Sequence, residues 1–331
     1  MDIGTQLARE IFNPANSFEE RCLNVFRFQY QHNKIYREYV NALGVNADLV
    51  YQTAQIPFLP IRFFKTHKVV STNFEAATIF ESSGTTETIN SKHLVKDTAI
   101  YEQSFFSCFE DFYGDVSQWC VVGLLPAYLE RSGSSLVYMV QQMIEKSNHE
   151  KSGFYLYDFE ALSNTLKTLE QQQQKTLLIG VTFALLDFAA LHPQPLQHTI
   201  VMETGGMKGR RKEMIRAEVH DLLRKSFSTT HIHSEYGMTE LLSQAYSKGN
   251  GLFKTPHWMR VLLRDEDDPL TLKNTKKATE RGLVNIIDLA NIYSCSFIAT
   301  DDLGIVHADG SFEITGRMDN SDLRGCSLLA L

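Results

Sequence analysis

Four hydroxyl side chains surround one glycine between residues 79 and 97, directly after an apolar run typical of a strand. The hydroxyl donors are Ser82, Ser83, Thr85 and Thr86. Gly84 lets backbone N–H groups approach an anion, and Lys92 could add a positive charge. The segment is not a Walker A loop, which requires a second glycine followed by Lys and then Ser or Thr. The pattern indicates a loop that holds phosphates, with an ordinary polar turn as the alternative.

Two more apolar runs end in glycine turns. The run 198–204 leads into Gly205 and Gly206, ahead of a helix expected over 208–225. The run that begins at residue 229 leads into Gly237. Backbone N–H groups at such turns lie at the carboxyl edge of a parallel sheet, where ligands bind in folds of this kind. A tight turn without a ligand remains the alternative for each.

The residues beside Gly237 suit a bound nucleotide. Tyr236 offers an aromatic face to a purine, while Thr239 and Glu240 supply a hydroxyl and a carboxylate suited to phosphate-bound magnesium. Further along, Asp302 (or its neighbour Asp301) could bind ribose hydroxyls, and Arg317 could meet a phosphate or the ribose. Taken singly, the aspartate is more typical of a turn residue and Arg317 of a surface arginine.

A metal site is a second interpretation of the strand before Gly237. Strand alternation would place His231, His233 and Glu235 on one face, which permits a divalent-metal site. Buried or supporting histidines are the commoner outcome of such a pattern, so we favour them over metal ligands.

The elements that must position these residues alternate between strand and helix patterns. Helices are expected within 17–40 and over 97–112, 134–146 (with Ser134 or Ser135 as N-cap) and 159–174, and strands over 119–129, 153–158 and 176–183. This rhythm predicts a parallel sheet flanked by helices. In the helix 208–225, Ile215, Val219 and Leu222 are expected on one face. The segment 55–64 contains two prolines and is expected to be extended or a turn.

The C-terminal third has a different pattern. Short apolar segments alternate with charged turns over 258–288, as in antiparallel strands, and 299–317 is expected to form a hairpin that turns at Asp309 and Gly310. The whole chain is therefore expected to be an α/β protein with a parallel sheet and a smaller antiparallel region.

Composition excludes several classes of function. The 331 residues carry a net charge of −7, which argues against a general nucleic-acid or anionic-membrane binder. No apolar run reaches the length of a membrane span and no signal peptide is indicated, so we expect a cytoplasmic protein without integral membrane association. The cysteines are widely spaced and odd in number, which indicates buried thiols instead of a disulfide framework; they are Cys22, Cys108, Cys120, Cys295 and Cys326.

Several motifs together resemble the adenylate-forming acyl and aryl ligases. In order, they are SSGTTE (82–87), YGMTE (236–240), TDDLG (300–304) and GRMDNSDLRG (316–325). The acyl-protein synthetase (LuxE-like) branch, related to phenylacetate–CoA ligases, is the most similar. Its further matches are LLPAYLERSGSSLV, METGGMKG, DLAN and RGCSLL. The resemblance covers residue 57 to the end.

The resemblance implies the large N-terminal domain of that fold over 57–315. Residues 1–56 would be a helical segment packed on it, and 316–331 a hinge-like tail. It implies ATP and Mg²⁺ as cofactors. Residues 82–86 would hold the β- and γ-phosphates, and Gly205 and Gly206 would line the adenine and acyl site. The remaining implied roles are adenine stacking for Tyr236 beside Gly237, an α-phosphate contact for Thr239, Mg²⁺ binding for Glu240, ribose binding for Asp302 and a nearby charge from Arg317.

Two departures from the family pattern stand out. Glu87 replaces a glycine of the phosphate loop, and the mobile C-terminal domain, with the lysine that promotes adenylation, is expected to be absent. Lys92, Arg317 or Arg324, or a partner, would then supply the charge. In acyl-protein synthetases the acyl group passes to a cysteine near the C-terminus, and Cys326 matches it; a buried strand cysteine is the alternative.

The expected activity is ATP-dependent activation of a carboxylic acid, of the fatty-acid class, to an acyl adenylate, followed by transfer to a protein thiol. The acceptor partner would be a reductase, transferase or carrier protein. Two alternatives remain: an acyl- or aryl-CoA ligase, and a non-catalytic nucleotide-binding subunit.

Overall fold

The structure is a computed structural model that describes residues 3–318 except 83–88, 126–132, 206–213, 269 and 274–278. The helices are α1 (Ile3–Glu10), α2 (Phe18–His32), α3 (Lys34–Ala42), α4 (Phe63–Thr66), α5 (Thr98–Tyr113), α6 (Ser135–Ser147), α7 (Phe159–Gln171), α8 (Thr182–Leu191) and α9 (Arg216–Phe227), with short 3-10 turns η1 (Ala47–Leu49), η2 (Thr53–Gln55), η3 (Val116–Gln118) and η4 (Leu289–Asn291). The strands are β1 (Leu59–Pro60), β2 (Thr78–Glu81), β3 (Lys92–Val95), β4 (Cys120–Leu124), β5 (Gly153–Phe154), β6 (Thr176–Gly180), β7 (Thr199–Glu203), β8 (His233–Tyr236), β9 (Ala245–Ser247), β10 (Phe253–Lys254), β11 (Met259–Arg264), β12 (Glu280–Asp288), β13 (Phe297–Val306) and β14 (Phe312–Arg317).

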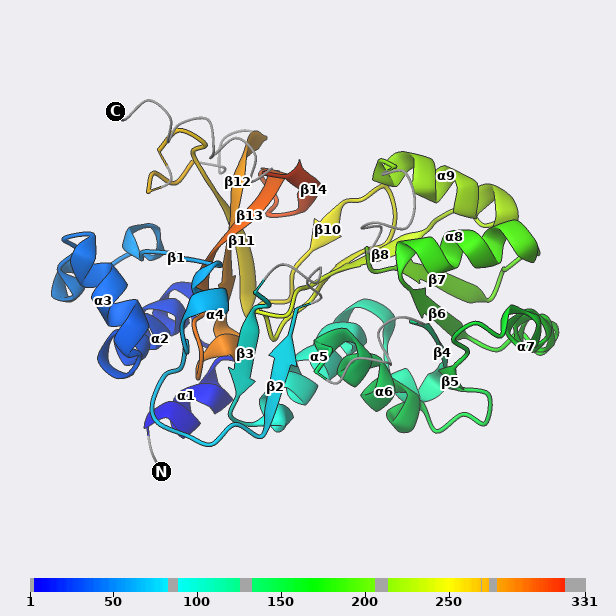
Figure 1. Ribbon diagram of the computed structural model, residues 1–331, viewed down its shortest axis with the longest axis horizontal. Coiled ribbons are helices and arrows are strands. Elements are labelled where there is room, and N and C mark those ends of the chain that lie inside the picture. The colour runs from blue at the N-terminus through cyan, green and yellow to red at the C-terminus, as the bar shows by residue number, and fades with distance from the viewer. Residues whose placement is uncertain are drawn as a thin grey trace.

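One long mixed sheet runs through the described residues in the order β11-β12-β13-β14-β10-β9-β8-β7-β6-β4-β5. Its β5–β4–β6–β7–β8 part is parallel, and its β9-to-β11 part is antiparallel. The hairpin β2–β3 forms a separate small sheet. The two parts of the long sheet form the two halves of the molecule (Figure 1). The predicted parallel sheet, antiparallel region and 299–317 hairpin are thus confirmed.

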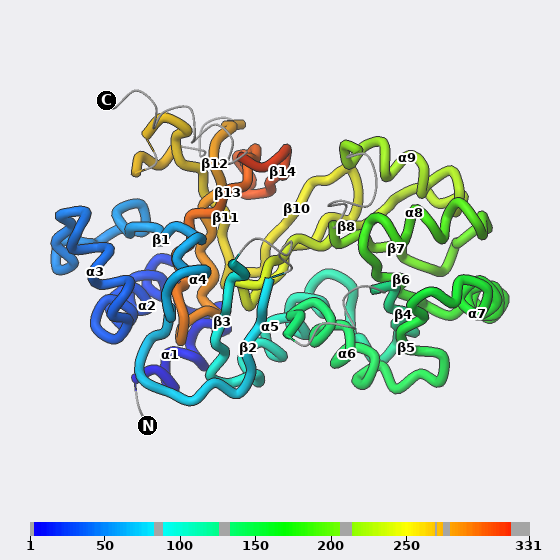
Figure 2. Tube along the Cα trace, in the orientation of Figure 1, coloured from blue at the N-terminus to red at the C-terminus, as the bar shows by residue number. Residues whose placement is uncertain are grey.

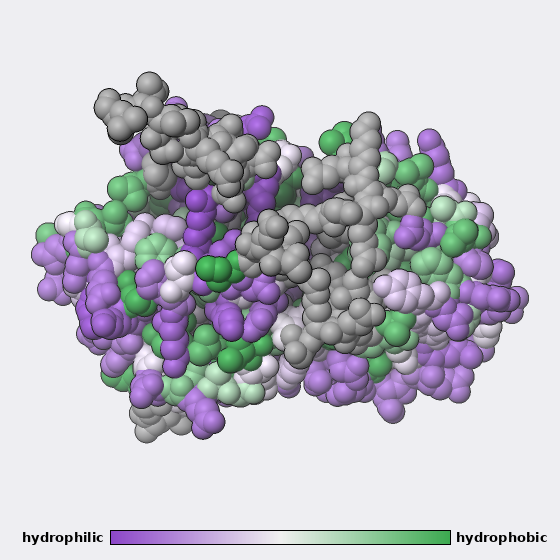
Figure 3. Space-filling view, viewed as in Figure 1, coloured by the Kyte–Doolittle hydropathy of each residue, from purple (hydrophilic) through white to green (hydrophobic). Residues whose placement is uncertain are grey.

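Burial explains why the parallel half forms. Every residue of β4 and β6 is buried, as expected for strands covered by helices on both faces. In Figure 1, α8 and α9 lie side by side along one face of these strands, while α5 and α6 lie along the other. Polar residues instead gather over the outer ends of both halves on the face shown in Figure 3.

Side-chain caps fix where several helices begin. Ser134 accepts a hydrogen bond from Val137 N at the start of α6, as predicted, and Asp97 caps α5 in the same way through Ala99 N. Such caps satisfy backbone donors that a first helical turn leaves free.

One local prediction was wrong, and one helix was missed. The helix α9 buries Val219, Leu223 and Phe227, while Ile215 and Leu222 are exposed. The helix starts at residue 216, and its buried apolar residues recur every four positions, so Leu223 and not Leu222 faces the core. The helix α8 was not predicted, because its sequence is almost wholly apolar and shows no helical period. The segment 55–64 is extended or turn over residues 56–62, as predicted, and only its last two residues belong to the one-turn helix α4.

The N-terminal helices are joined to the antiparallel half through buried polar contacts. Gln29 Nε2, on α2, donates to the carbonyls of Asn291 and Ile292 at 2.9 and 3.1 Å. Gln29 Oε1 accepts from Ser296 N at 3.0 Å. These contacts hold η4 and the following turn against α2. The division of the chain at residues 56 and 315 stays a prediction.

Candidate active site

Tyr236, Asp302 and Arg317 meet where the two halves of the sheet join. Tyr236 ends β8, Asp302 lies within β13, and Arg317 ends β14. The Tyr236 hydroxyl donates to Asp302 Oδ2 at 2.7 Å, and Arg317 Nε lies 3.2 Å from Asp302 Oδ1. Asp302 is only 8% exposed. Residues that are up to 81 positions apart in the chain therefore form one polar cluster, which we call the Asp302 cluster.

The Tyr236 ring is held by two phenylalanines. Its centroid lies 5.9 Å from that of Phe253 and 5.6 Å from that of Phe312. Burial, followed by the charge of Asp302, raises the pKa of Tyr236 well above its ordinary value. The phenol therefore stays protonated and donates to Asp302.

The turn after Tyr236 carries the predicted Thr239 and Glu240. A Cβ at Gly237 would overlap Glu235 Oε1, so a larger residue at this position would require the Glu235 carboxyl to shift. Glu240 is 6% exposed, and the Ser91 side chain lies near its carboxyl. Burial raises the pKa of Glu240, although Ser91 and the charges of Arg317 and Lys65 lower it. A cation beside Glu240 would offset the desolvation of its carboxylate.

Gly205 sits on a buried network at the end of β7. Its φ is +78°, a conformation that favours glycine, and its N–H donates to Glu203 Oε1 at 2.9 Å. Glu203 also accepts from Thr182 Oγ1 at 2.7 Å and Ser234 Oγ at 3.2 Å, and lies 3.7 Å from His220 Nε2. These contacts fix the glycine turn at the sheet edge.

Two carboxyl groups at this edge have opposite pKa shifts. Burial would raise the pKa of Glu203, but the contact with His220, the charge of Arg216 and the Thr182 hydrogen bond together lower it. Burial, and then the charge of Glu203, raises the pKa of Glu235 to about 8. Glu203 is therefore ionised and Glu235 protonated at neutral pH.

The hairpin β2–β3 carries the described part of the predicted phosphate loop. Ser82 N donates to the Ser91 carbonyl at 3.1 Å, and Ser91 N donates to Ser82 Oγ at 2.9 Å. Lys92 Nζ lies 3.3 Å from Glu81 Oε1 and is 59% exposed. Lys92 therefore pairs across the hairpin. The other predicted residues, namely Ser83, Gly84, Thr85, Thr86, Glu87, Gly206, Arg324 and Cys326, lie outside the described residues.

The metal interpretation of the strand before Gly237 is not supported. Within the described ranges, no group of three or more His, Cys, Asp or Glu side chains has the arrangement of a metal site. His233 Nδ1 instead lies 3.1 Å from the Tyr113 hydroxyl, and burial lowers the pKa of His233 to about 4. The described cysteines are buried, as predicted, and burial raises the pKa of Cys22 and Cys295 to about 12.

Sequence reasoning missed several supporting residues. His93 Nδ1 donates to the Thr239 carbonyl, and Asn291 Nδ2 donates to the Glu240 carbonyl, both at 2.8 Å. Asp288 accepts from Leu242 N and Ser243 N at 2.8 and 3.0 Å. Polar residues inside otherwise buried segments were the available signal.

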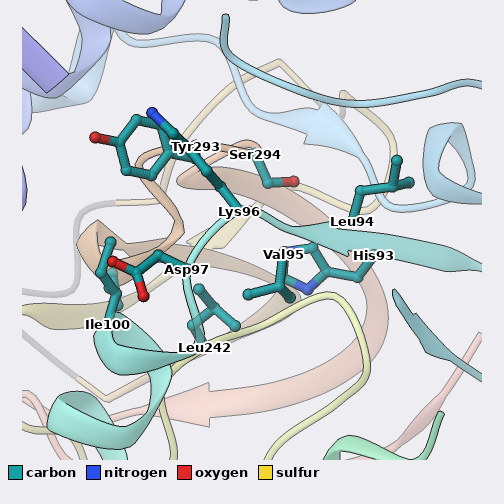
Figure 4. A pocket seen from close by; sticks show the side chains of 10 residues that line it. His93, Leu94, Val95, Lys96, Asp97, Ile100, Leu242, Tyr293 and Ser294 are labelled. Atoms are coloured by element: carbon teal, nitrogen blue, oxygen red, sulfur yellow. The ribbon is translucent and has the colours of Figure 1, made fainter. Parts of the chain in front are cut away.

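A small pocket lies next to this support, with His93 and Leu242 in its lining (Figure 4). Lys96 Nζ, on its wall, lies 3.9 Å from the Tyr293 ring centroid. Its full lining is His93, Leu94, Val95, Lys96, Asp97, Ile100, Leu242, Ala290, Tyr293 and Ser294. Because none of these residues belongs to the Asp302 cluster, we do not take the pocket as the reaction site.

Comparison with known sequences agrees with the motifs. Residues 13–124 match the sequence model of the family "Acyl-protein synthetase, LuxE". The long-chain-fatty-acid–luciferin-component ligase of Vibrio harveyi is 23% identical over 331 residues, which cover 92% of this chain and 84% of that protein. The chain is therefore LuxE-like in the sense that residues 13–124 are similar to that family. The ligase of the same name from Aliivibrio fischeri is 24% identical over 353 residues, covering 94% of this LuxE-like chain and 89% of that protein.

Solved structures show the fold. The LuxE-like chain matches ATP-bound MatB from Rhodopseudomonas palustris with a TM-score of 0.54 and 14% identity, over 73% of this chain and 48% of MatB. It matches a 2-hydroxyisobutyryl-CoA ligase in its postadenylation state with a TM-score of 0.59 and 10% identity, over 91% of this chain and 68% of that one. The chain thus spans about half the length of MatB. It has the fold of the N-terminal domain of adenylate-forming ligases.

Proposed function

We propose that this LuxE-like chain activates a carboxylic acid with ATP and passes the acyl group to a protein thiol. The observation that carries the proposal is the Asp302 cluster, whose Arg317 charge also acts on the buried carboxyl of Glu240. The two curated relatives are named as long-chain-fatty-acid–luciferin-component ligases, so we propose a fatty acid as the substrate.

In the first step, a carboxylate oxygen of the acid attacks the α-phosphorus of ATP. The bond from that phosphorus to the pyrophosphate oxygen breaks, and pyrophosphate leaves. Such a step needs positioning and charge neutralisation more than proton transfer. We assign the adenine to Tyr236, the ribose hydroxyls to Asp302, the α-phosphate to Thr239 and a phosphate charge contact to Arg317.

Glu240 fits the role of a magnesium ligand. Its carboxyl is buried, that burial raises its pKa, and the nearby Ser91 side chain favours its ionised form. Bound Mg²⁺ would neutralise charge on the phosphate oxygens. Ser82, with the other predicted residues of the phosphate loop, would donate hydrogen bonds to the phosphates. Gly205 would line the adenine and acyl site.

In the second step, a thiolate sulfur attacks the carbonyl carbon of the acyl adenylate. The carbon–oxygen bond to AMP breaks, AMP leaves and a thioester forms. The described cysteines are buried with raised pKa values where a shift is resolved, so they are poor nucleophiles. Because Cys326 matches the acyl-accepting cysteine of the acyl-protein synthetases that the sequence resembles, we assign the thiol to Cys326, from which the acyl group would pass to a protein partner.

The proposed setting is the cytoplasm, where ATP is available and thiols stay reduced. In the described part of the chain, no helix combines the length and apolar character that crossing a bilayer requires.

ATP–pyrophosphate exchange with a panel of short, medium, long-chain and aromatic acids tests the first step. We expect exchange with fatty acids, and its loss on Tyr236→Ala or Glu240→Ala. A matched control is Glu38→Ala, because Glu38 is 59% exposed in a surface pair with Lys34. Exchange by Glu240→Ala at the wild-type rate would refute the site assignment.

Product analysis separates the alternatives. Acyl label on the wild-type chain that is lost in Cys326→Ala supports transfer to that thiol. Thioester formed only with coenzyme A would indicate a CoA ligase, and ATP binding without exchange for any acid would indicate a non-catalytic subunit.

A further inference from the structure

The hairpin β2–β3 is fastened to the turn that carries Thr239 and Glu240. In Figure 2 the hairpin trace passes next to the chain that follows β8. Ser91 directly precedes β3, and His93 lies two residues later, so both point to the same face of the strand. Both are buried, at 1% and 0% exposure, while Lys92 between them is exposed.

Each of these two side chains contacts a different member of the turn. His93 Nδ1 lies 2.8 Å from the Thr239 carbonyl oxygen, which can only accept, so Nδ1 carries the proton. The Ser91 side chain lies near the Glu240 carboxyl and lowers its pKa, which favours the ionised form. Through its backbone, Ser91 also pairs with Ser82 at the end of β2. One short strand therefore connects three residues of the proposed site.

His93 has no other polar role in the described part of the chain. Its Nε2 is buried without a hydrogen-bond partner there, and its ring packs at 82° against Phe64, with the centroids 5.8 Å apart. Burial lowers its pKa to about 4, so the ring stays neutral and its donating Nδ1–H is retained near neutral pH. A buried polar group is costly unless it is paired, which indicates that the Thr239 bond is the reason for a histidine here.

We propose that Ser91 and His93 are positioning residues for adenylation. They hold Glu240 and Thr239 in a fixed position relative to the end of the hairpin, where Ser82 lies. The proposal rests on the proposed function for its consequence in the reaction. The clamp itself, which we define as Ser91 and His93 with the contacts above, makes a separate structural prediction.

Substitutions at His93 test the donor at Nδ1. The amide nitrogen of Asn is attached to Cγ as Nδ1 is, so His93→Asn retains a donor at that position, whereas His93→Leu removes it at similar volume. We expect His93→Leu to lower kcat for ATP–pyrophosphate exchange at least tenfold and His93→Asn to stay within about threefold of wild type, at equal thermal stability of the two variants. Equal kcat for both variants would overturn the role of the donor.

Substitution at Ser91 tests the link to Glu240. We expect Ser91→Ala to raise the Mg²⁺ concentration for half-maximal exchange at least threefold, because the Glu240 carboxylate loses the nearby hydroxyl that favours its ionised form. The control is Ser163→Ala, since Ser163 is also buried but bonds to Gln194 at 3.3 Å, away from the site. An unchanged Mg²⁺ dependence in Ser91→Ala would overturn its role.

Hydrogen exchange separates the clamp from the proposed function. The clamp predicts faster amide exchange in His93→Leu for both β3 and the turn, whose Leu241 N donates to the Met238 carbonyl at 3.1 Å. This result is expected whether or not the protein forms adenylates. Wild-type protein that fails to exchange pyrophosphate refutes the proposed function alone, and unchanged amide exchange in both segments refutes the clamp.

Discussion

Glu203→Leu removes the acceptor at the centre of the network beneath Gly205. In the wild-type chain Glu203 is 6% exposed and accepts hydrogen bonds from Thr182 Oγ1, Gly205 N and Ser234 Oγ. The leucine side chain is similar in size but offers no acceptor. The Gly205 N–H then loses its carboxylate partner, and the two hydroxyls must find other acceptors.

The cost follows from the number and charge of these bonds. A hydrogen bond to a charged group contributes about 1.5–3 kcal/mol, and a buried donor left alone costs about 1–3 kcal/mol. Hydroxyls can rotate to other acceptors, whereas the Gly205 N–H cannot. We therefore expect Glu203→Leu to lower the free energy of unfolding by about 3–5 kcal/mol, in the range seen when one partner of a buried pair is removed. Glu203→Gln keeps one acceptor and should cost about half as much.

Urea unfolding at pH 7 measures the loss. The matched control is Glu170→Leu, at the opposite end of β7, where Glu170 accepts from Gln197 N, His198 N and Thr199 Oγ1 in a more exposed position. We expect the control to lose less stability and to keep its exchange activity. If Glu203→Leu unfolds within about 0.5 kcal/mol of wild type, the network does not stabilise the glycine turn as argued.

The pH dependence gives a second check on the same residue. The folded-state pKa of Glu203 is lowered, so its stabilising contribution is present above the unfolded-state value near 4.5 and is lost as the pH falls through the folded-state value. Glu203→Leu should therefore differ most from wild type at neutral pH and converge with it in acid. A difference that stays constant down to acid pH would contradict the ionic account.

Three further predictions concern the same edge of the sheet. Glu235→Gln should gain stability relative to wild type as the pH rises from about 4.5 to about 8, because only the wild-type carboxyl must stay protonated in the folded state. The difference in the free energy of unfolding should change with a slope that approaches about 1.4 kcal/mol per pH unit. An equal difference between the two proteins at pH 5 and pH 8 would contradict this. Tyr236→Phe should lower the free energy of unfolding by about 1–3 kcal/mol and raise the KM for ATP, since Asp302 loses its phenol donor; unchanged values in both assays would refute it. Gly205→Ala and Gly310→Ala, at φ +78° and +84°, should each lower the free energy of unfolding by about 1–2 kcal/mol through backbone strain. Only Gly205→Ala should slow pyrophosphate exchange. Equal exchange rates in the two variants would exclude a role in the site for the Gly205 turn.

Local sequence patterns were sufficient for most elements. Strands such as β4 and β6 are short apolar runs between helices with polar caps, so their type and parallel arrangement follow from residues close in the chain. The turn at Asp309 and Gly310 follows from a local preference, because an Asp-Gly pair suits the backbone conformation of a hairpin turn. Patterns failed where the period was lost or displaced, as in α8, which is apolar on all sides, and in α9.

The sequence by itself determined the residue types at the candidate site. Tyr236, Glu240, Asp302 and Arg317 were predicted because aromatic, carboxylate and guanidinium groups suit a nucleotide and its metal, and because their motifs occur in a family order. The spacing along the chain, however, contains no distance between strands. The 2.7 Å bond between Tyr236 and Asp302 depends on how β8 and β13 are brought together through β9, β10 and β14.

Only the tertiary structure decided which polar residues support the site. His93 and Glu203 lie in buried segments where the sequence predicts packing, and their partners are remote or in neighbouring strands: Thr239 is 146 positions from His93, and Ser234 is 31 positions from Glu203. The physical reason is that burial and pairing are properties of the folded interior. The pKa of the Glu203 carboxyl is lowered and that of the Glu235 carboxyl is raised because folding places different groups around each of them.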